Sequence, residues 1–325
     1  MVNRRITYRL YPNQEQQVKL LEMRRLHQQL YNAALEERIQ AYRKCSRSLS
    51  FAQQCKSLTQ LRAELPEYEA LNAQSSQVTL KRVDDAYAGF FRRIKDPTCK
   101  NAGFPRFKSI RRYSGWGYKK HGDGWRLFAS KKHGSLRLSG VGMLKLRGKA
   151  RTLGTPKTLE ILYKQGKWYA SVVMDCEPVR ESGTQAVGID WGVETFATMA
   201  QDDGSFEAIA NERHLQSHLP ALARLQRDLA RKKRGSRNWR KLKQQLAALH
   251  ARIARQRQEF LHQTTARIVK DHALIAVEKL NVKAMTAAGG GRKTGLNREI
   301  LSTSPGKFHD LLKTKAEEAV RHEVA

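Results

Sequence analysis

Apolar and polar positions in the first 95 residues predict one strand followed by a helical bundle. Residues 3–11 alternate as a strand does, and Pro12 ends them. Between 14 and about 44, apolar side chains recur at helical spacing. Two further helical stretches, near 51–65 and 76–95, follow the same periodicity. The polar faces of the predicted bundle are rich in Arg, Lys and Gln.

The pattern changes near Asp96, where short alternating stretches separated by glycine begin. A hairpin is predicted between 159–163 and 168–174, around Gln165, Gly166 and Lys167. Together these stretches predict a small β-barrel or sandwich. The other predicted strands of this region are 125–129, 135–138 and 143–146.

A third region begins near Thr184 and mixes apolar strands with long helices. Strand 186–190 ends in Asp190, and strand 273–277 is followed by Glu278. We predict that 193–200 is the partner of the first of these strands. The remaining elements expected are a helical pair over 216–270, a break at the glycines of 289–291 and a last helix over about 305–322.

The charge of the chain points to an anionic partner. Of 325 residues, 61 are Lys or Arg and 30 are Asp or Glu, so the formal net charge is +31. Hydrophobic residues make up 40%, which excludes a disordered basic tail. Because such a charge repels itself in a folded chain, a nucleic acid is the natural counterweight. Ribosomal proteins, nucleases and transposases share this profile, so charge alone selects no chemistry.

A membrane-bound protein is the competing class. No apolar run reaches the roughly 18 residues that a spanning helix needs. Residues 1–9 lack the apolar segment of a signal peptide. We therefore expect a soluble protein of the prokaryotic cytoplasm, associated with the nucleoid and not with a membrane.

Two segments are candidates for contact with nucleic acid. Residues 224–257 carry thirteen Arg or Lys and one acid, Asp228, whereas a solvated helix face normally mixes both signs. Segment 104–120 interleaves aromatics with cations, so it either stacks on bases or is a loop whose aromatics belong to the core. We expect contacts from Arg106, Lys108, Arg231, Lys232, Lys233, Arg234, Arg237, Arg240 and Lys241.

Asp190 and Glu278 are the candidate catalytic residues and metal ligands. A strand that is apolar on both faces is expected at the centre of a sheet, covered by helices. Two acids at strand ends converge only if the strands are neighbours, and a divalent metal would then compensate their charge. The alternative is that each acid pairs with a nearby Arg or Lys. Sequence patterning leaves both interpretations open.

Several motifs, in order along nearly the whole chain, resemble the TnpB family of transposon-encoded RNA-guided nucleases, which is related to type V CRISPR effectors. They include LYPN at 10–13, YNAALEERIQAY at 31–42, GFPRFKS at 103–109, GIDWGVETFAT at 188–198, the basic helix at 231–263, IAVEKLNVKAM at 275–285 and LNREILSTSPGKFHDLLKTKAEEA at 296–319.

The resemblance implies an α+β multidomain fold, in which a helical recognition lobe and a small β-barrel wedge domain are inserted into an RNase H-like RuvC nuclease domain. It assigns 1–11 to the first strand of the wedge barrel and 12–95 to the recognition lobe. It assigns 96–183 to the wedge domain and 184–325 to an incomplete RuvC-like domain. The family's first catalytic Asp matches Asp190, and its catalytic Glu matches Glu278.

The resemblance also implies partners and a reaction. Family members bind a guide RNA from their own insertion sequence and read a short motif beside the double-stranded DNA target. They then cut the DNA with Mg²⁺, while base pairing supplies the sequence specificity.

The match ends before the family's zinc ribbon and third catalytic Asp. The four cysteines form no CxxC pair, so the Zn²⁺ ligands of the family are absent from these residues, and we expect cleavage by this chain to be impaired. The alternatives are a nuclease-dead RNA-guided DNA-binding protein that blocks transcription, and a basic RNA-binding or chaperone-like protein. The cysteines are Cys45, Cys55, Cys99 and Cys176.

Overall fold

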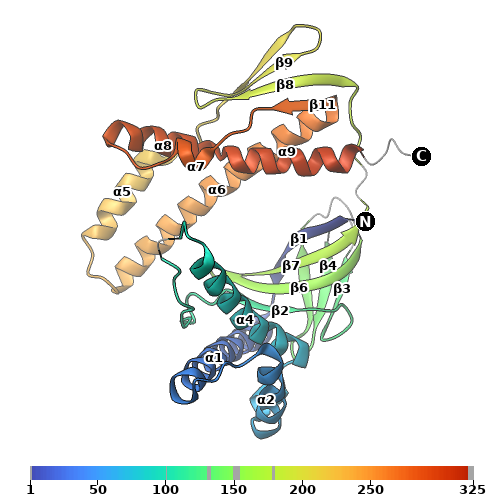
Figure 1. Cartoon of the computed structure of the whole chain (residues 1–325), viewed down its shortest axis with the longest axis vertical. Coiled ribbons are helices and arrows are strands. Elements are labelled where there is room, and N and C mark those ends of the chain that lie inside the picture. The colour runs from blue at the N-terminus through green and yellow to red at the C-terminus, as the bar shows by residue number, and fades with distance from the viewer. Residues whose placement is uncertain (1, 100, 130–132, 149–153, 178–179, 321–325) are drawn as a thin grey trace. The chain divides into compact units, whose positions relative to one another are not determined.

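The computed structural model describes residues 2–99, 101–129, 133–148, 154–177 and 180–320. The chain forms two compact units, Met1–Glu177 and Pro178–Ala325. The first unit joins a curled sheet to a group of helices, and the second joins a smaller sheet to long helices (Figure 1).

The sheet of the first unit has seven antiparallel strands in the order β2-β6-β7-β1-β5-β4-β3. The first strand of the chain lies inside this sheet, between β7 and β5, so its pairing is non-local on both sides. The strands are β1 (Val2–Tyr11), β2 (Gly115–Tyr118), β3 (Trp125–Ala129), β4 (His133–Leu138), β5 (Gly142–Arg147), β6 (Thr155–Lys164) and β7 (Lys167–Cys176).

Strict alternation of apolar residues gives this sheet an inner face. Tyr8 and Leu10 of β1, Leu136 of β4 and Trp168 of β7 are buried there, as period-two patterning requires. The predicted β6–β7 hairpin is confirmed, with Tyr163 paired to Trp168. Its turn places Gln165 and Gly166 at φ 51° and 74°, as a two-residue hairpin turn needs.

Four helices precede the bulk of the sheet in the chain. The first two begin with capping boxes, at Asn13 with Gln16 and at Ser50 with Gln53, in which side chain and backbone satisfy each other's free donors. Helices and sheet share one apolar core. The helices are α1 (Gln14–Cys45), α2 (Phe51–Glu64), α3 (Pro66–Glu69) and α4 (Ala73–Lys95).

A buried histidine lies where α1 and α4 meet the sheet. The His27 ring stacks on Trp116 of β2, with centroids 5.4 Å apart. Its ring nitrogens lie 2.9 Å from the Thr79 hydroxyl and 3.3 Å from the Ser75 hydroxyl on α4. Burial, with a smaller contribution from Arg82, lowers the pKa of His27 to about 3. His27 is therefore neutral in the folded protein at physiological pH.

The second unit contains a four-stranded sheet in the order β10-β9-β8-β11. The β8–β11 pair is parallel and the other two pairs are antiparallel. The strands are β8 (Gln185–Trp191), β9 (Thr195–Gln201), β10 (Phe206–Ala210) and β11 (His272–Val277); the helices are η1 (Gln216–His218), α5 (Leu219–Ala230), α6 (Arg237–Asp271), α7 (Val282–Met285), α8 (Gly291–Thr303) and α9 (Pro305–Val320).

One face of this sheet packs against helices. Val187 and Ile189 of β8 share a core with Leu261 of α6 and Phe308 of α9. Helices α6 and α9 are held together by the buried Lys315, whose ammonium donates to the Thr265 hydroxyl at 2.7 Å. The residues that lie between these buried ones along each strand form the opposite face of the sheet.

One prediction about this sheet is wrong. Strand β11 was expected at the centre of the sheet because all its residues after His272 are apolar, yet among the described strands it lies at the edge. Leu274 is 66% exposed and Val277 is 43% exposed. The apolar composition of a strand shows that its side chains can be buried, but it does not determine whether the strand has a neighbour on both sides. Strand β8, flanked by β9 and β11, does occupy an interior position.

Most predicted elements are confirmed within a few residues, and the misses are short or rich in glycine. Strand β2 was not predicted because two of its four residues are glycine. Strand β10 was also missed, and α8 begins within the glycine run that was expected to break the chain. The last two residues of the predicted helix 305–322 lie outside the described residues. No helix in the described part of the chain is long and apolar enough to cross a membrane.

We predict a pH dependence of stability from His27. Its pKa is lower in the folded state than the unfolded value near 6.5, so the unfolded chain binds the extra proton as pH falls. The stabilisation is complete above pH 6.5 and decreases toward pH 3. Between pH 7 and pH 5, this one group should lower the free energy of unfolding by about 2 kcal/mol. Urea denaturation at the two pH values, compared with His27→Gln, measures this contribution.

In the variant the residue no longer titrates, so the loss between pH 7 and pH 5 should shrink by that amount. An equal pH dependence in the two proteins would show that His27 is not buried in its neutral form.

Candidate metal site and nucleic-acid interface

The two candidate catalytic acids end neighbouring parallel strands. In the β8–β11 register, Gly188 pairs with Ala276 and Ile189 pairs with Val277. Asp190 is the next residue of β8, and Glu278 directly follows the last residue of β11. Because neighbouring strands lie about 4.8 Å apart, this register places the two backbone positions side by side. The strand pairing that sequence patterning left open therefore brings both acids to the same end of one sheet.

Both carboxylates are exposed and uncompensated by protein cations. Among the described residues, neither Asp190 nor Glu278 forms an ion pair or accepts a hydrogen bond, so the interpretation that each pairs with a nearby Arg or Lys has no support there. The negative charge of Glu278 does act on a nearby side chain, His309 of α9. Burial lowers the pKa of His309, and the negative charges of Asp310 and Glu278 oppose that shift.

Small side chains leave the sheet open beside Asp190. Its partner on β9 is Thr198, and Gly188 pairs with Ala200. A methyl group added at Gly188 would meet only the Ala200 carbonyl oxygen, at 4.0 Å. A bulky ligand therefore has room to approach this part of the sheet.

The donor set suits a hard divalent cation shared with a substrate. Within the described residues, no group of three His, Cys, Asp or Glu side chains is arranged to hold a metal ion. Mg²⁺ prefers oxygen ligands and is commonly held by one or two carboxylates together with phosphate oxygens. Two adjacent carboxylates fit that mode of binding, whereas a closed structural zinc site would need four ligands.

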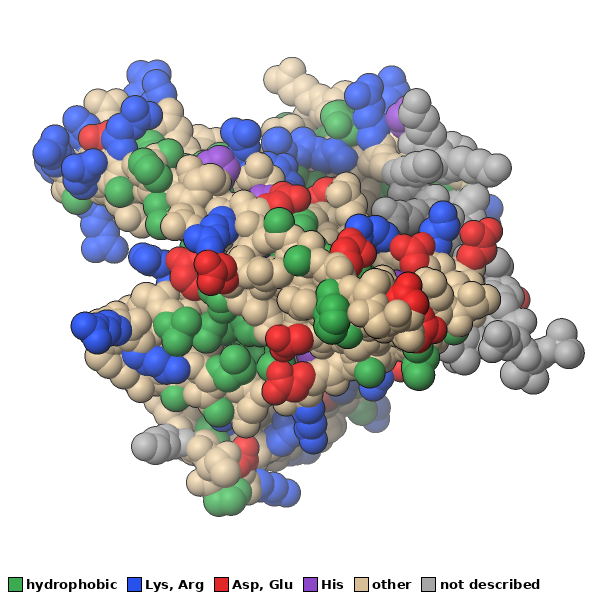
Figure 2. All heavy atoms as spheres, turned by 90° about the horizontal axis from the view of Figure 1, so that it is seen from above, with side chains coloured by type: hydrophobic (Ala, Val, Ile, Leu, Met, Phe, Trp, Pro, Cys, Tyr) green, Lys and Arg blue, Asp and Glu red, His purple; other side chains and the backbone are tan. Residues whose placement is uncertain are grey.

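The basic segment 224–257 forms the α5–α6 hairpin. Leu222 of α5 and Ile253 of α6 are buried. Further leucines that face the partner helix are half-buried: Leu225, Leu229, Leu242, Leu246 and Leu249. Apolar residues therefore join the two helices and leave the cations outside. A dense group of Lys and Arg side chains is visible on the face drawn in Figure 2. The seven predicted contacts in the hairpin are all exposed and form no ion pair with the described residues: Arg231, Lys232, Lys233, Arg234, Arg237, Arg240 and Lys241.

The other two predicted contacts lie in different environments. Arg106 is exposed. The Lys108 ammonium is half-buried 4.3 Å above the Tyr31 ring, and burial lowers the pKa of Lys108, with a smaller effect from Arg82. The Lys108 backbone is held by Asn32 of α1, which both donates to it and accepts from it. Lys108 thus already has a packing role in the first unit.

The aromatics of segment 104–120 divide between the two alternatives. Tyr113, Trp116 and Tyr118 are buried in the core. Phe104 and Phe107 are exposed. Each of the two interpretations therefore describes part of the segment.

Sequence reasoning missed a second basic surface. It lies on strands β1, β3, β4 and β5, each of which carries one to three cations. No local stretch there is basic enough to stand out. The available signal was the complete lack of Asp and Glu from all four strands.

Two models of known protein families match parts of this chain. Residues 169–288 match the model of the OrfB protein of IS605 elements, described as a "Probable transposase". Residues 1–47 match the associated "Helix-turn-helix domain", a stretch that here contains β1 and the single long helix α1.

Curated relatives carry related names. A protein of Escherichia coli K12, "Putative RNA-guided DNA endonuclease InsQ", is 34% identical over 242 residues, which are 70% of this chain and 56% of that protein. A "Putative RNA-guided DNA endonuclease" of Streptomyces pristinaespiralis is 30% identical over 299 residues, 89% of this chain and 69% of that one. The chain thus spans just over half the length of the first relative and about two thirds of the second.

A solved structure supports the fold. The cryo-EM structure of Cas12f1 with sgRNA and target DNA superposes with a TM-score of 0.58, covering 98% of this chain and 88% of Cas12f1 at 11% identity. The family models and the relatives define a protein of the OrfB class. The chain belongs to the TnpB family.

We predict that cysteines at the two acidic positions form a disulfide. If the β8–β11 register continues one residue beyond the Ile189–Val277 pair, residues 190 and 278 lie opposite each other, within the range that a disulfide spans. Mild oxidation of an Asp190→Cys/Glu278→Cys variant, followed by peptide mass spectrometry, should reveal the cross-link. In Asp190→Cys/Lys279→Cys the second cysteine lies one residue further along, where alternation turns it to the other face, and we expect little cross-link. Equal cross-linking of both pairs would contradict the register.

Proposed function

We propose that this chain acts as an RNA-guided DNA endonuclease of the TnpB type. The observation that carries the proposal is the parallel pairing of β8 with β11, whose last pair, Ile189 with Val277, directly precedes Asp190 and Glu278. The names of the two curated relatives support the same activity. Metal-assisted cleavage of a phosphodiester is the chemistry that an open pair of carboxylates serves best.

In this proposal Asp190 and Glu278 hold Mg²⁺ against a phosphate of the target strand. The bound Mg²⁺ would supply Lewis-acid stabilisation of the charge that develops on the phosphate oxygens. The protein's part is to fix two carboxylate oxygens at the end of a rigid sheet and to leave space for the substrate. The small residues Gly188 and Thr198 beside Asp190 provide that space.

The cations of the α5–α6 hairpin, together with Arg106 and Lys108, would follow the phosphates of the guide RNA and the DNA target. The guide would come from the element's own RNA, and base pairing would select the target. We further propose that 12–95 serves as recognition lobe, that 1–11 with 96–183 serves as wedge, and that 184–325 serves as nuclease domain.

We predict that Asp190→Asn abolishes cleavage and preserves binding. Removing one of two metal-holding carboxylates should lower the rate by about 100-fold or more, because the phosphate loses its Lewis acid. The measurement is linearisation of a matching plasmid by the chain purified with RNA from its own locus, in Mg²⁺. Retention of the labelled target is followed in parallel.

Asp271→Asn is the matched control, since Asp271 is also exposed but precedes β11 at its opposite end. It should cleave like the parent chain. Equal cleavage by Asp190→Asn and the parent would contradict the assignment of Asp190 to the metal site. Guide-dependent retention with no cleavage by any of the three proteins would indicate an RNA-guided binder that blocks transcription.

A second prediction concerns the salt dependence of binding. Replacing Arg231, Lys232, Lys233 and Arg234 with Gln should reduce the slope of log affinity against log salt. Each lost phosphate contact should account for about 0.7 to 0.9 of a slope unit, because fewer counterions are released. Filter binding of the guide RNA between low and moderate salt measures the slope.

A charge-matched control removes four cations that are equally exposed but already paired with acids. They are Lys19 with Glu15, Arg25 with Glu22, Lys81 with Asp84 and Arg267 with Glu207. The net charge falls by the same amount in both variants, so a slope that changes equally in both would reject specific contacts by the hairpin.

A further inference from the structure

The outer face of strands β3, β4, β5 and β1 carries cations opposite one another. Arg126 of β3 pairs directly with Arg137 of β4, and Arg147 of β5 pairs directly with Arg9 of β1. Like charges at directly opposite positions destabilise a sheet. The same arrangement occurs twice on one face, so the fold tolerates a repulsion that an anionic ligand would relieve. We call this surface, with Lys145 between the two pairs, the basic–aromatic face.

No acid in these four strands offsets the charge. None of them contains Asp or Glu. The acids on the rest of the outer face, Glu160 of β6 and Asp175 of β7, are bound to other cations, Arg82 and Lys157 among them. Within the part of the chain that the structure describes, Arg126, Arg137, Lys145 and Arg147 have no ion pair. Their positive charge is therefore available to a partner.

Aromatic rings are interleaved with these cations. Phe128 is 51% exposed and Tyr11 is 44% exposed. The register aligns them in one row, Phe128 opposite Ser135, Ser135 opposite Lys145, and Lys145 opposite Tyr11. The guanidinium of Arg147 lies 4.9 Å from the Tyr11 ring centroid, and that of Arg9 lies 5.4 Å from it. Tyr11, flanked by two arginines, and the exposed Phe128 thus offer ring surface on a solvated sheet face.

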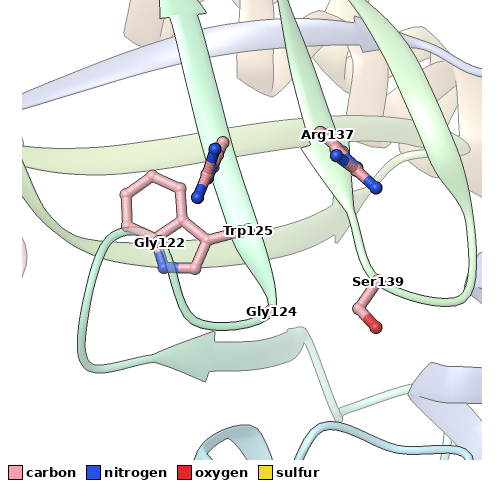
Figure 3. Close-up of a pocket in the computed structure, with 6 residues that line it drawn as sticks. Gly122, Gly124, Trp125, Arg137 and Ser139 are labelled. Carbon is pink, nitrogen blue, oxygen red and sulfur yellow. The ribbon is translucent and has the colours of Figure 1, made fainter.

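A hollow of about 320 Å³ lies at one end of this face, lined by Arg126, Arg137 and Ser139. Figure 3 shows the turn of Gly122 and Gly124 beside the strand that begins at Trp125, with Arg137 and Ser139 on and just after the neighbouring strand. Two guanidinium groups and a hydroxyl match the oxygens of a phosphate group. The glycines at the turn, at φ 92° and 75°, add no side chain that would block approach.

We propose that the basic–aromatic face binds a single-stranded stretch of nucleic acid. Tyr11 and Phe128 stack on unpaired bases, and Arg126 and Arg137 hold a phosphate in the hollow. The preference for single strands follows from the rings, since the bases of a duplex already stack on one another and present no free face. This inference rests on the proposed function in so far as nucleic acid is the partner.

The test compares aromatic variants that keep the charge. Full-length chain, Tyr11→Leu and Phe128→Leu are titrated against fluorescent 20-nucleotide oligouridine RNA, oligothymidine DNA and a 20-base-pair DNA duplex. Each variant should bind the single strands about fivefold or more weakly, because it loses one stacked base. Binding of the duplex and the salt slope should stay as in the parent. Comparison of the RNA and DNA titrations shows which single strand the face prefers.

Phe206→Leu is the control, because Phe206 is an exposed phenylalanine on the sheet of the second unit, 76% exposed against 51% for Phe128. It should bind all three probes like the parent. A second pair of variants tests the phosphate site. Arg126→Gln/Arg137→Gln should lower the salt slope for oligouridine by about 0.7 per lost contact. Arg25→Gln/Lys81→Gln, which removes two paired surface cations, should leave it unchanged.

The outcomes separate this inference from the proposed function. If the parent binds the probes and both aromatic variants bind single strands equally well, the inference is wrong and the proposed function stands. If the aromatic variants weaken single-strand and duplex binding alike, the face is not a base-stacking surface. The same conclusion follows if polyglutamate, added at the same concentration of negative charges as oligouridine, displaces oligouridine from the parent. A parent chain that binds no probe overturns both.

Discussion

A net charge of +31 must be held in two compact units, and the fold meets this constraint by separating two kinds of cation. Some form ion pairs that are partly or largely buried, Arg38 with Asp84, Arg82 with Glu160 and Arg180 with Glu318. These pairs use acids that would otherwise neutralise the surface. Within the described residues, the Lys and Arg side chains of 231–241 in the α5–α6 hairpin and those of β3, β4 and β5 form no ion pair. These surfaces are therefore positive because the acids of the chain lie elsewhere and pair with other cations.

Both units also depend on pairing between strands that are distant in the chain. In the first unit, β1 lies between β7 and β5, so the N-terminal strand completes the sheet and aligns Arg9 and Tyr11 with cations of β5. In the second unit, β9, β10, α5 and α6 lie between β8 and β11 in the chain, and the parallel register runs to the residues that precede Asp190 and Glu278. Parallel strands need such a long connection, and here it includes the basic hairpin. One connection thus supplies the cations and positions the carboxylates.

The two surfaces suggest a division of labour within the proposed function. An exposed helical hairpin rich in Arg and Lys suits the regular phosphate spacing of a duplex. A flat sheet face with rings and opposed arginines suits unpaired bases. A guided nuclease handles both kinds of nucleic acid, since its guide includes unpaired segments and its target begins as a duplex. The open face beside Asp190 would then receive a strand already separated from its partner.

The sequence by itself determined the elements and most of what they carry. Apolar periodicity located β1, α1, β3 and the β6–β7 hairpin, because local burial patterns depend on neighbours two to four residues away. It also identified Asp190 and Glu278 as the acids worth examining. Glycine-rich β2 and α8 escaped, because glycine carries no side chain to report burial.

Only the tertiary structure decided which strands are neighbours. It placed β11 at the edge of its sheet, paired β11 in parallel with β8, and assembled the basic–aromatic face from four strands, none of which stands out in the sequence. The physical reason is that strand order is set by long-range contacts and loop closure, which leave no periodic trace in the sequence of any single strand.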